Sequence, residues 1–138
     1  MKYESQSVAR LYFFGALTIF ALQLVFGLAG ALLYVMPTLI PTDILPFSVA
    51  RMIHTNALIV WLLMGFFGAG YYLIPEEAER EIESPLLAYI QLGLLMFGAL
   101  AAVVGYVFGI HEGREFLEQP LWIKGAIVVV ALIFLYNI

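Results

Sequence analysis

Four long apolar runs, separated by short polar or proline-containing segments, make up most of the chain. Charged residues are absent between Arg10 and Asp43, between Arg51 and Glu76, between Glu83 and Glu112, and after Lys124. A helix needs about 20 apolar residues to cross the hydrocarbon core of a bilayer. We therefore predict membrane-spanning helices near residues 11–36, 47–74, 85–110 and 121–138.

Helix is the expected conformation of these runs, because lipid offers no hydrogen-bond partner to the open edge of a strand. The sequence also lacks the alternation of polar and apolar residues that membrane β-strands show. Ser48 is placed to cap the second helix, and Pro75 is expected to end it. Ser84 followed by Pro85 is typical of a helix start and predicts the beginning of the third helix.

Composition supports a chain whose solvent is largely lipid. Of the 138 residues, 64% are hydrophobic and only 12% are charged, and the mean hydropathy is +1.00. Soluble domains are about half apolar and a quarter charged. We predict an all-α integral membrane protein, in which residues 1–138 form a single membrane region of about four transmembrane helices.

Charge and cysteine content exclude several classes of function. The net charge is −4 and the basic residues are scattered, so no nucleic acid partner is expected. The chain has no cysteine, which excludes disulfides, thiolate metal sites and covalent attachment of a c-type haem.

Arg51 and His54 are the polar groups that most need a reason, because they open an apolar run. Their spacing places both on one face of a helix, and ionisable groups inside a membrane are functional candidates. In one interpretation, His54 bonds to a neighbouring helix and Arg51 reaches the headgroups. In the other, the imidazole is an axial ligand of a haem iron and the guanidinium pairs with a propionate. The two residues alone leave both interpretations open.

A second polar cluster lies in residues 113–120, between the third and fourth runs. Glu115 and Glu118 offer oxygen ligands for a hard cation such as calcium, although their spacing favours an ordinary solvated loop. His111 and the acidic run 75–83 are also predicted to be loop segments. In an antiparallel bundle this loop and the start of the second helix share one end, so several side chains can converge there: Arg51, His54, Arg114, Glu115 and Glu118.

Two stretches resemble a known family: ARMIHTNALIVWLLMGFFGAGYYLIPEE at residues 50–77 and GREFLEQP at residues 113–120. In this order they are similar to the N-terminal part of the large subunit of bacterial cytochrome c-dependent nitric oxide reductases, which belong to the haem–copper oxidase superfamily. The resemblance covers essentially the whole chain. The short polar stretch before the first run favours this type over the quinol-dependent relatives. The implied fold is a larger helical bundle, of which these helices are part.

The resemblance implies a role for each matching residue. His54 matches an axial ligand of the low-spin haem b, Arg51 a contact of the haem propionates, and Glu115 a ligand of a calcium ion that bridges propionates of two haems. Glu118 matches a second acidic position of the same segment. Lys and Arg are evenly divided between the two sides, so charge gives no orientation. The family implies a bacterial inner (cell) membrane, with the N-terminus cytoplasmic and His54 and Glu115 toward the periplasm.

The activity implied is reduction of NO to N2O in the respiratory chain of denitrification. Haem b would pass electrons to a site of haem b3 and non-haem iron, whose ligands lie further along in the family. The only histidines here are His54 and His111, so we expect residues 1–138 to be inactive alone. The expected partners are the remainder of the large subunit, a cytochrome c-type small subunit and membrane lipid. Two alternatives are a piece of a cbb3-like terminal oxidase, which shares His-Thr-Asn and reduces O2, and a non-catalytic membrane scaffold.

Overall fold

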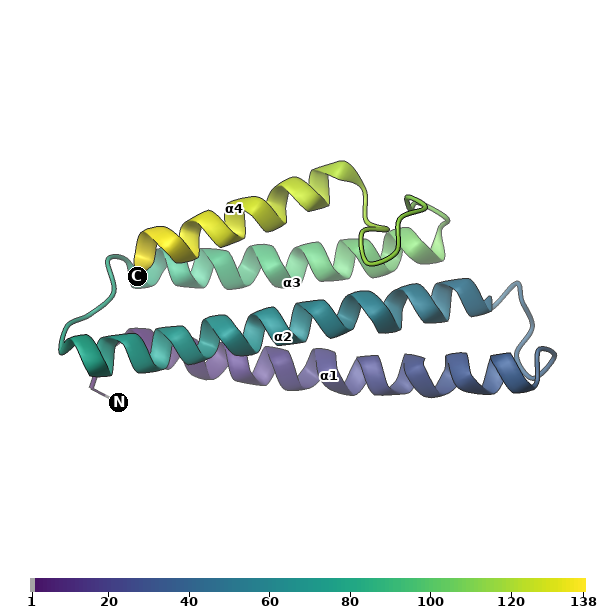
Figure 1. The fold of residues 1–138 in the computed structure, drawn as a ribbon, viewed down its shortest axis with the longest axis horizontal. Coiled ribbons are helices and arrows are strands. Elements are labelled where there is room, and N and C mark those ends of the chain that lie inside the picture. Colours follow the sequence, from purple (N-terminus) through teal and green to yellow (C-terminus); the bar gives the residue numbers. More distant parts are fainter. Residues whose placement is uncertain (1) are drawn as a thin grey trace.

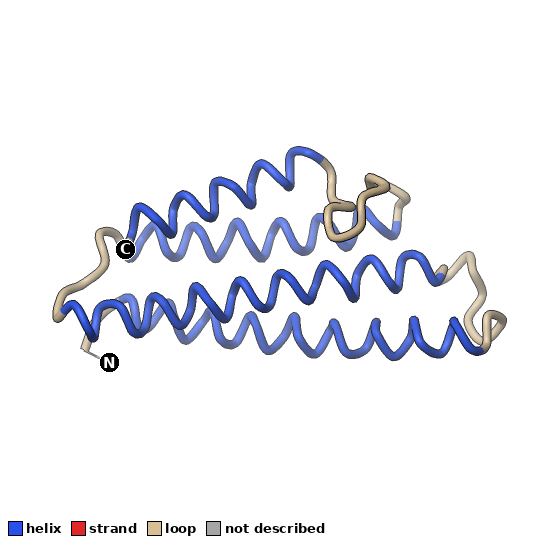
Figure 2. Tube along the Cα trace, in the orientation of Figure 1, coloured by secondary structure: helices blue, strands red, loops and turns tan. Residues whose placement is uncertain are grey.

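A computed structural model describes residues 2–138, which fold into four helices joined by loops (Figures 1 and 2). The helices are α1 (Ser5–Val35), α2 (Phe47–Ala78), α3 (Pro85–Val107) and α4 (Leu121–Asn137). No strand occurs within residues 2–138, so the all-α class is confirmed. By length and composition, α1, α2 and α3 are able to cross a membrane. The apolar α4 has 17 residues, slightly fewer than the about 20 that a span needs.

The helices form two antiparallel pairs. The long helices α1 and α2 lie along each other, and α3 and α4 form a second layer beside α2 (Figure 1). Both termini and the α2–α3 loop lie at one end, and the α1–α2 and α3–α4 loops lie at the other. Large apolar side chains such as Phe14 and Leu17 are 62% and 64% exposed, as lipid-facing residues are.

The ends of α2 differ from the prediction. Pro46 is extended and precedes the first helical residue, Phe47, so Ser48 lies inside the helix and does not cap it. Pro75 also lies inside α2, which continues to Ala78 and ends where Glu79 adopts a left-handed φ of 51°. A proline removes only its own backbone donor, so a long helix can continue for a turn beyond it.

The ends of α3 follow well-known capping rules. Ser84 is extended and its side chain accepts a hydrogen bond from the Leu87 amide, which confirms the predicted start. The helix ends at Val107, before the predicted residue 110, because Gly109 takes a left-handed φ of 75°. The Ile110 amide then bonds back to the Gly105 carbonyl at 2.7 Å, which is the pattern of a Schellman motif.

The acidic run 75–83 is more than the solvated loop that the sequence suggested. The Glu81 carboxylate accepts hydrogen bonds from the backbone amides of Glu4 and Ser5, and so satisfies donors at the start of α1. Burial alone would raise the pKa of Glu81, but hydrogen bonds from Ser5, Ile82 and Glu4 outweigh it and hold the pKa below its ordinary value. This anchor is therefore formed at neutral pH and is lost only as the pH falls through that lowered pKa.

A buried hydrogen-bond network joins all four helices. The hydroxyls of Tyr12 and Tyr71 donate to the Gln91 side-chain oxygen at 2.8 and 2.6 Å. The Gln91 amide group in turn donates to the Val130 carbonyl at 2.8 Å, and Asn137 donates to the Tyr71 hydroxyl at 3.3 Å. Buried polar groups that find partners in this way hold helices together where apolar contacts alone give little specificity.

Candidate functional site

The His54 imidazole faces α1. Its Nδ1 lies 2.8 Å from the backbone carbonyl oxygen of Gln23. A carbonyl oxygen can only accept, so Nδ1 carries the proton and Nε2 keeps its lone pair. No hydrogen bond to Nε2 is formed by any of residues 2–138. The ring is therefore held in the tautomer that a metal ligand requires.

A groove beside His54 lies between α1 and the beginning of α2. Its volume is about 370 Å³, and Arg51 and His54 both line it. The α1 side is formed partly by small residues, namely Gly27, Gly30 and Ala31. An imidazole with a free lone pair, a guanidinium and an apolar wall with little side-chain bulk fit the edge and the propionates of a haem.

Arg51 lies between this groove and the α3–α4 loop. Its guanidinium is 3.1 Å from a carboxylate oxygen of Glu115 and 3.6 Å from one of Glu118. The Glu115 side chain is 66% exposed, so water screens that pair and its contribution to stability is at most about 1 kcal/mol. The pair with Glu118 is different, because the Glu118 side chain is only 3% exposed.

Glu118 is a buried carboxylate with incomplete hydrogen bonding. One oxygen accepts from the Asn56 side-chain amide at 2.8 Å. The other oxygen, Oε1, has no hydrogen bond within residues 2–138, and Arg51 is its ion-pair partner. Burying a carboxylate is costly unless cations and donors compensate it, so Arg51 and Asn56 together stabilise the charged form of this residue.

The loop that presents Glu115 and Glu118 is tied at both ends. The Glu112 amide bonds to the Glu118 carbonyl at 2.6 Å, and Lys124 of α4 donates to the Glu112 carboxylate. That ammonium holds the pKa of the Glu112 carboxyl below its usual range. Phe116 has a left-handed φ of 62°, which is unfavourable for a residue with a side chain. The strained turn places Glu115 and Glu118 on the same side as Arg51.

The predicted convergence is confirmed for three of the five residues, Arg51, Glu115 and Glu118. His54 shares the helix end with them but points into the groove against α1. Arg114 and His111 are exposed in the loop, as a loop histidine was predicted to be.

Three contributors were missed by the sequence analysis: Gln23, Gly27 and Asn56. Each had a weak signal in the sequence. Gln23 is a polar residue in the uncharged first run, and Asn56 is a second polar residue just after His54.

The described residues do not form a complete cation site. No group of three or more His, Cys, Asp or Glu side chains within residues 2–138 is placed to hold a metal ion. Calcium takes six to eight oxygen ligands, roughly, so Glu115 and Glu118 are able to supply only part of a coordination shell. The orphaned Oε1 of Glu118 and the exposed carboxylate of Glu115 fit such a partial contribution.

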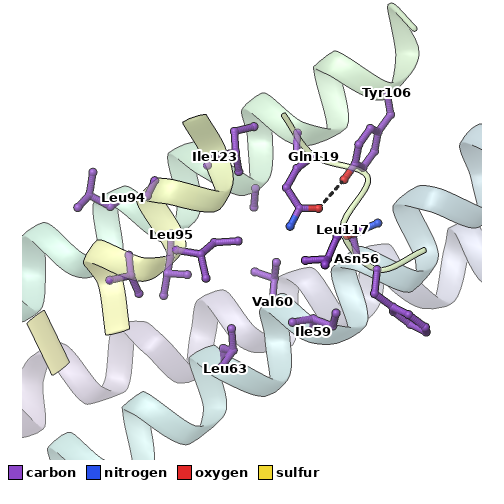
Figure 3. Close-up of a pocket in the computed structure, with 17 residues that line it drawn as sticks. Asn56, Ile59, Val60, Leu63, Leu94, Leu95, Tyr106, Leu117, Gln119 and Ile123 are labelled. Carbon is purple, nitrogen blue, oxygen red and sulfur yellow. Dashed lines mark hydrogen bonds between the residues drawn. The ribbon is translucent and has the colours of Figure 1, made fainter. Parts of the chain in front are cut away.

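A separate apolar cavity of about 170 Å³ lies between α2, α3 and α4 (Figure 3). Its few polar lining groups are already engaged: the Tyr106 hydroxyl donates to Gln119 at 3.4 Å, and Asn56 donates to Glu118. The remaining lining side chains that Figure 3 labels, such as Val60 and Leu95, are apolar. The cavity therefore offers no free group to a charged ligand.

Comparison with known proteins extends these observations. The family model described as "Cytochrome C and Quinol oxidase polypeptide I" matches residues 7–138. A nitric oxide reductase subunit of Stutzerimonas stutzeri is 48% identical over 152 aligned residues, which cover 100% of this chain and 32% of that protein. The chain thus spans about a third of the length of this relative. The resemblance to haem–copper oxidases that the two sequence stretches indicated is confirmed, and the chain belongs to the cytochrome c and quinol oxidase polypeptide I family.

Proposed function

We propose that this chain is the N-terminal part of the large subunit of a cytochrome c-dependent nitric oxide reductase and holds its low-spin haem b. The whole enzyme would reduce NO to N2O at a site of haem b3 and non-haem iron in the remainder of the subunit. The observation that carries the proposal is His54, whose Nδ1 is bonded to the Gln23 carbonyl while Nε2 is free. The 48% identity with a nitric oxide reductase subunit supports it.

Haem supplies one-electron redox chemistry when it is bound. In this chain, His54 would provide one axial nitrogen, and Arg51 would place a positive charge near the propionates. Gly27, Gly30 and Ala31 leave room on the α1 side of the groove. The apolar surroundings would limit water access and so set the dielectric in which electron transfer occurs.

Glu115 would bind calcium together with haem propionates. Its carboxylate is exposed and only 3.1 Å from Arg51, so it lies beside the cation that is also proposed to contact a propionate. Glu118 lies on the other side of Arg51 with one oxygen lacking a hydrogen bond. A cation here would relieve the negative charge that two carboxylates and a propionate bring together.

The proposed location is the bacterial inner membrane, with the N-terminus cytoplasmic and the site toward the periplasm. Three apolar helices of spanning length support a multi-pass membrane protein. The α3–α4 loop with Glu115 lies at the opposite end of the bundle from the N-terminus (Figure 1). A cytochrome c-type small subunit would then dock on the periplasmic side and deliver electrons to the haem that His54 holds.

The activity is tested with the complete complex under anaerobic conditions. With an electron donor, it should consume NO and release N2O, and the purified protein should show a Soret band. A second candidate, a cbb3-like oxidase, is kept because the family also contains oxidases; O2 consumption without NO reduction would favour it. Absence of any Soret band in the complete complex would leave only a membrane scaffold.

Replacing Arg51 by leucine should lower the reduction potential of the low-spin haem by tens of millivolts. A cation beside a propionate favours the electron-rich reduced state, by on the order of 1 kcal/mol at an effective dielectric of about 20. Redox titration of the complete complex measures the shift. Arg114→Leu is the matched control, because Arg114 is an exposed cation of the nearby loop. Equal potentials in the two variants would reject the contact between Arg51 and the propionates.

Replacing Glu115 by glutamine should lower calcium content and weaken haem retention. The substitution keeps the shape of the side chain and removes one charged ligand, and calcium affinity depends on ligand charge. Elemental analysis after matched chelator treatment gives the result. Glu77→Gln serves as a control, because this exposed carboxylate lies at the other end of the bundle. A calcium content equal to that of the parent would make Glu115 an ordinary loop residue.

A further inference from the structure

We propose that Gln23 and Gly27 of α1 form a positioning unit for the axial imidazole. The Gln23 carbonyl fixes the tautomer and the orientation of the His54 ring, and Gly27 keeps that carbonyl open to the ring. The inference rests on the proposed haem-binding role of His54. It assigns a function to two residues of the first helix, which lies outside both sequence stretches that resemble the family.

Gly27 is needed because of where helical carbonyls point. In an α-helix the carbonyl of residue 23 points along the axis toward residue 27, so a side chain at position 27 lies close to it. A Cβ atom at Gly27 would lie 2.6 Å from Nδ1 and 2.7 Å from Cε1 of His54. Both distances are too short for real contacts, so any other residue would push the ring off the carbonyl or separate the helices.

The steric requirement is specific to this position. At Gly30, the next glycine of α1, the nearest atoms to an added Cβ are 4.0 Å away. At Gly65 of α2 an added Cβ would meet nothing within 4 Å. General close packing of helices through small residues therefore does not explain Gly27, whereas the approach of the imidazole does.

The Gln23 side chain supplies a second connection between the same two helices. Its oxygen accepts from the Trp61 indole nitrogen at 2.6 Å, and Gln23 is buried with 7% of its surface exposed. Trp61 and His54 are seven residues apart and lie on one face of α2. Phe20 packs edge-on against the Trp61 ring at 5.0 Å. These contacts hinder rotation of α1 about its axis, so the Gln23 carbonyl stays opposite the imidazole.

The chemical consequence concerns the other ring nitrogen. A carbonyl that accepts the Nδ1 proton makes Nε2 a stronger donor, and it removes the freedom of the ring to rotate away from a metal. A stronger donor stabilises the oxidised iron more than the reduced iron. Gln23 and Gly27 would therefore increase haem affinity and lower the reduction potential, without either residue touching the haem iron.

Gly27→Ala in the complete subunit is the direct test. We expect the apparent haem affinity to fall roughly 10-fold to 100-fold, as is typical when the hydrogen-bond partner of a metal ligand is lost. In the haem that remains, the reduction potential should rise and the low-spin electron paramagnetic resonance signal should shift. Gly65→Ala is the matched control, because it makes the same change in a helix where the space is open.

Trp61→Phe keeps the inference testable if Gly27→Ala fails to assemble. This variant removes only the hydrogen bond to the Gln23 side chain, and it should shift the potential and the resonance signal in the same direction by a smaller amount. Potential, resonance signal and haem content identical to those of Gly65→Ala, in whichever variant assembles, would overturn the positioning unit. If His54→Ala also keeps its low-spin haem, the proposed function fails as well; if it loses the haem, only the positioning unit is rejected.

Discussion

Replacing His54 by alanine is expected to remove the low-spin haem b signal from the complete subunit. The imidazole has its Nδ1 bonded to Gln23 and its Nε2 free, so it is the ligand that this part of the chain offers to iron. Alanine provides no nitrogen, and a six-coordinate low-spin iron needs two axial ligands. Reduced-minus-oxidised spectra should show near-complete loss of the low-spin b-type bands.

His111→Ala provides the control for this experiment. His111 is the other histidine of the chain, and it is exposed in the α3–α4 loop. Its replacement should leave the low-spin bands unchanged. An intact six-coordinate low-spin haem in the His54 variant would reject the assignment, and loss of haem from both variants would show that the effect is not specific to the ligand.

Replacing Gln91 by leucine is expected to destabilise the bundle by about 2 kcal/mol, because a buried hydroxyl loses its acceptor. Gln91 is fully buried and accepts from both Tyr12 and Tyr71. Tyr12 keeps a second acceptor, the Ala88 carbonyl at 3.2 Å, so Tyr71 is the group left without one. Unfolding in mixed detergent micelles measures the change in free energy.

A double-mutant cycle separates this hydrogen bond from simple loss of packing. In Gln91→Leu combined with Tyr71→Phe, neither partner remains, so the penalty for an unsatisfied hydroxyl disappears. The double variant should therefore be less destabilised than the sum of the two single variants, by about 1 kcal/mol. Strict additivity would show that the Tyr71–Gln91 hydrogen bond does not stabilise the bundle.

The helices themselves were predictable from the sequence. Long uncharged runs between charged residues have one stable conformation in lipid, so the spacing of charge sufficed to place all four. Their ends were harder. Pro75 was expected to end α2, but a single missing backbone donor was insufficient to stop a long helix. Gly109 ended α3 through its left-handed conformation, which apolar patterning does not reveal.

The candidate site was predictable only where charge marked it. Arg51, Glu115 and Glu118 come together because a four-helix topology brings two loop ends to one side. The partner of His54 was not predictable, because a backbone carbonyl has no residue type of its own. The contact between His54 and Gln23 depends on how α1 rotates against α2, and side-chain packing decides that rotation. In the same way, Glu81 looked like a solvated acid until the fold placed the start of α1 beside it.

The groove that holds His54 is built from the first helical hairpin alone: all its lining residues come from α1 and α2. Glu115 and Glu118 belong to a loop that is synthesised later. During biogenesis, the imidazole, its carbonyl acceptor and the glycine beside them are therefore all present once two segments have entered the membrane. The carboxylates reach Arg51 only after the third segment has been inserted. Order along the chain thus separates a nascent cofactor half-site from the charge that later closes over it.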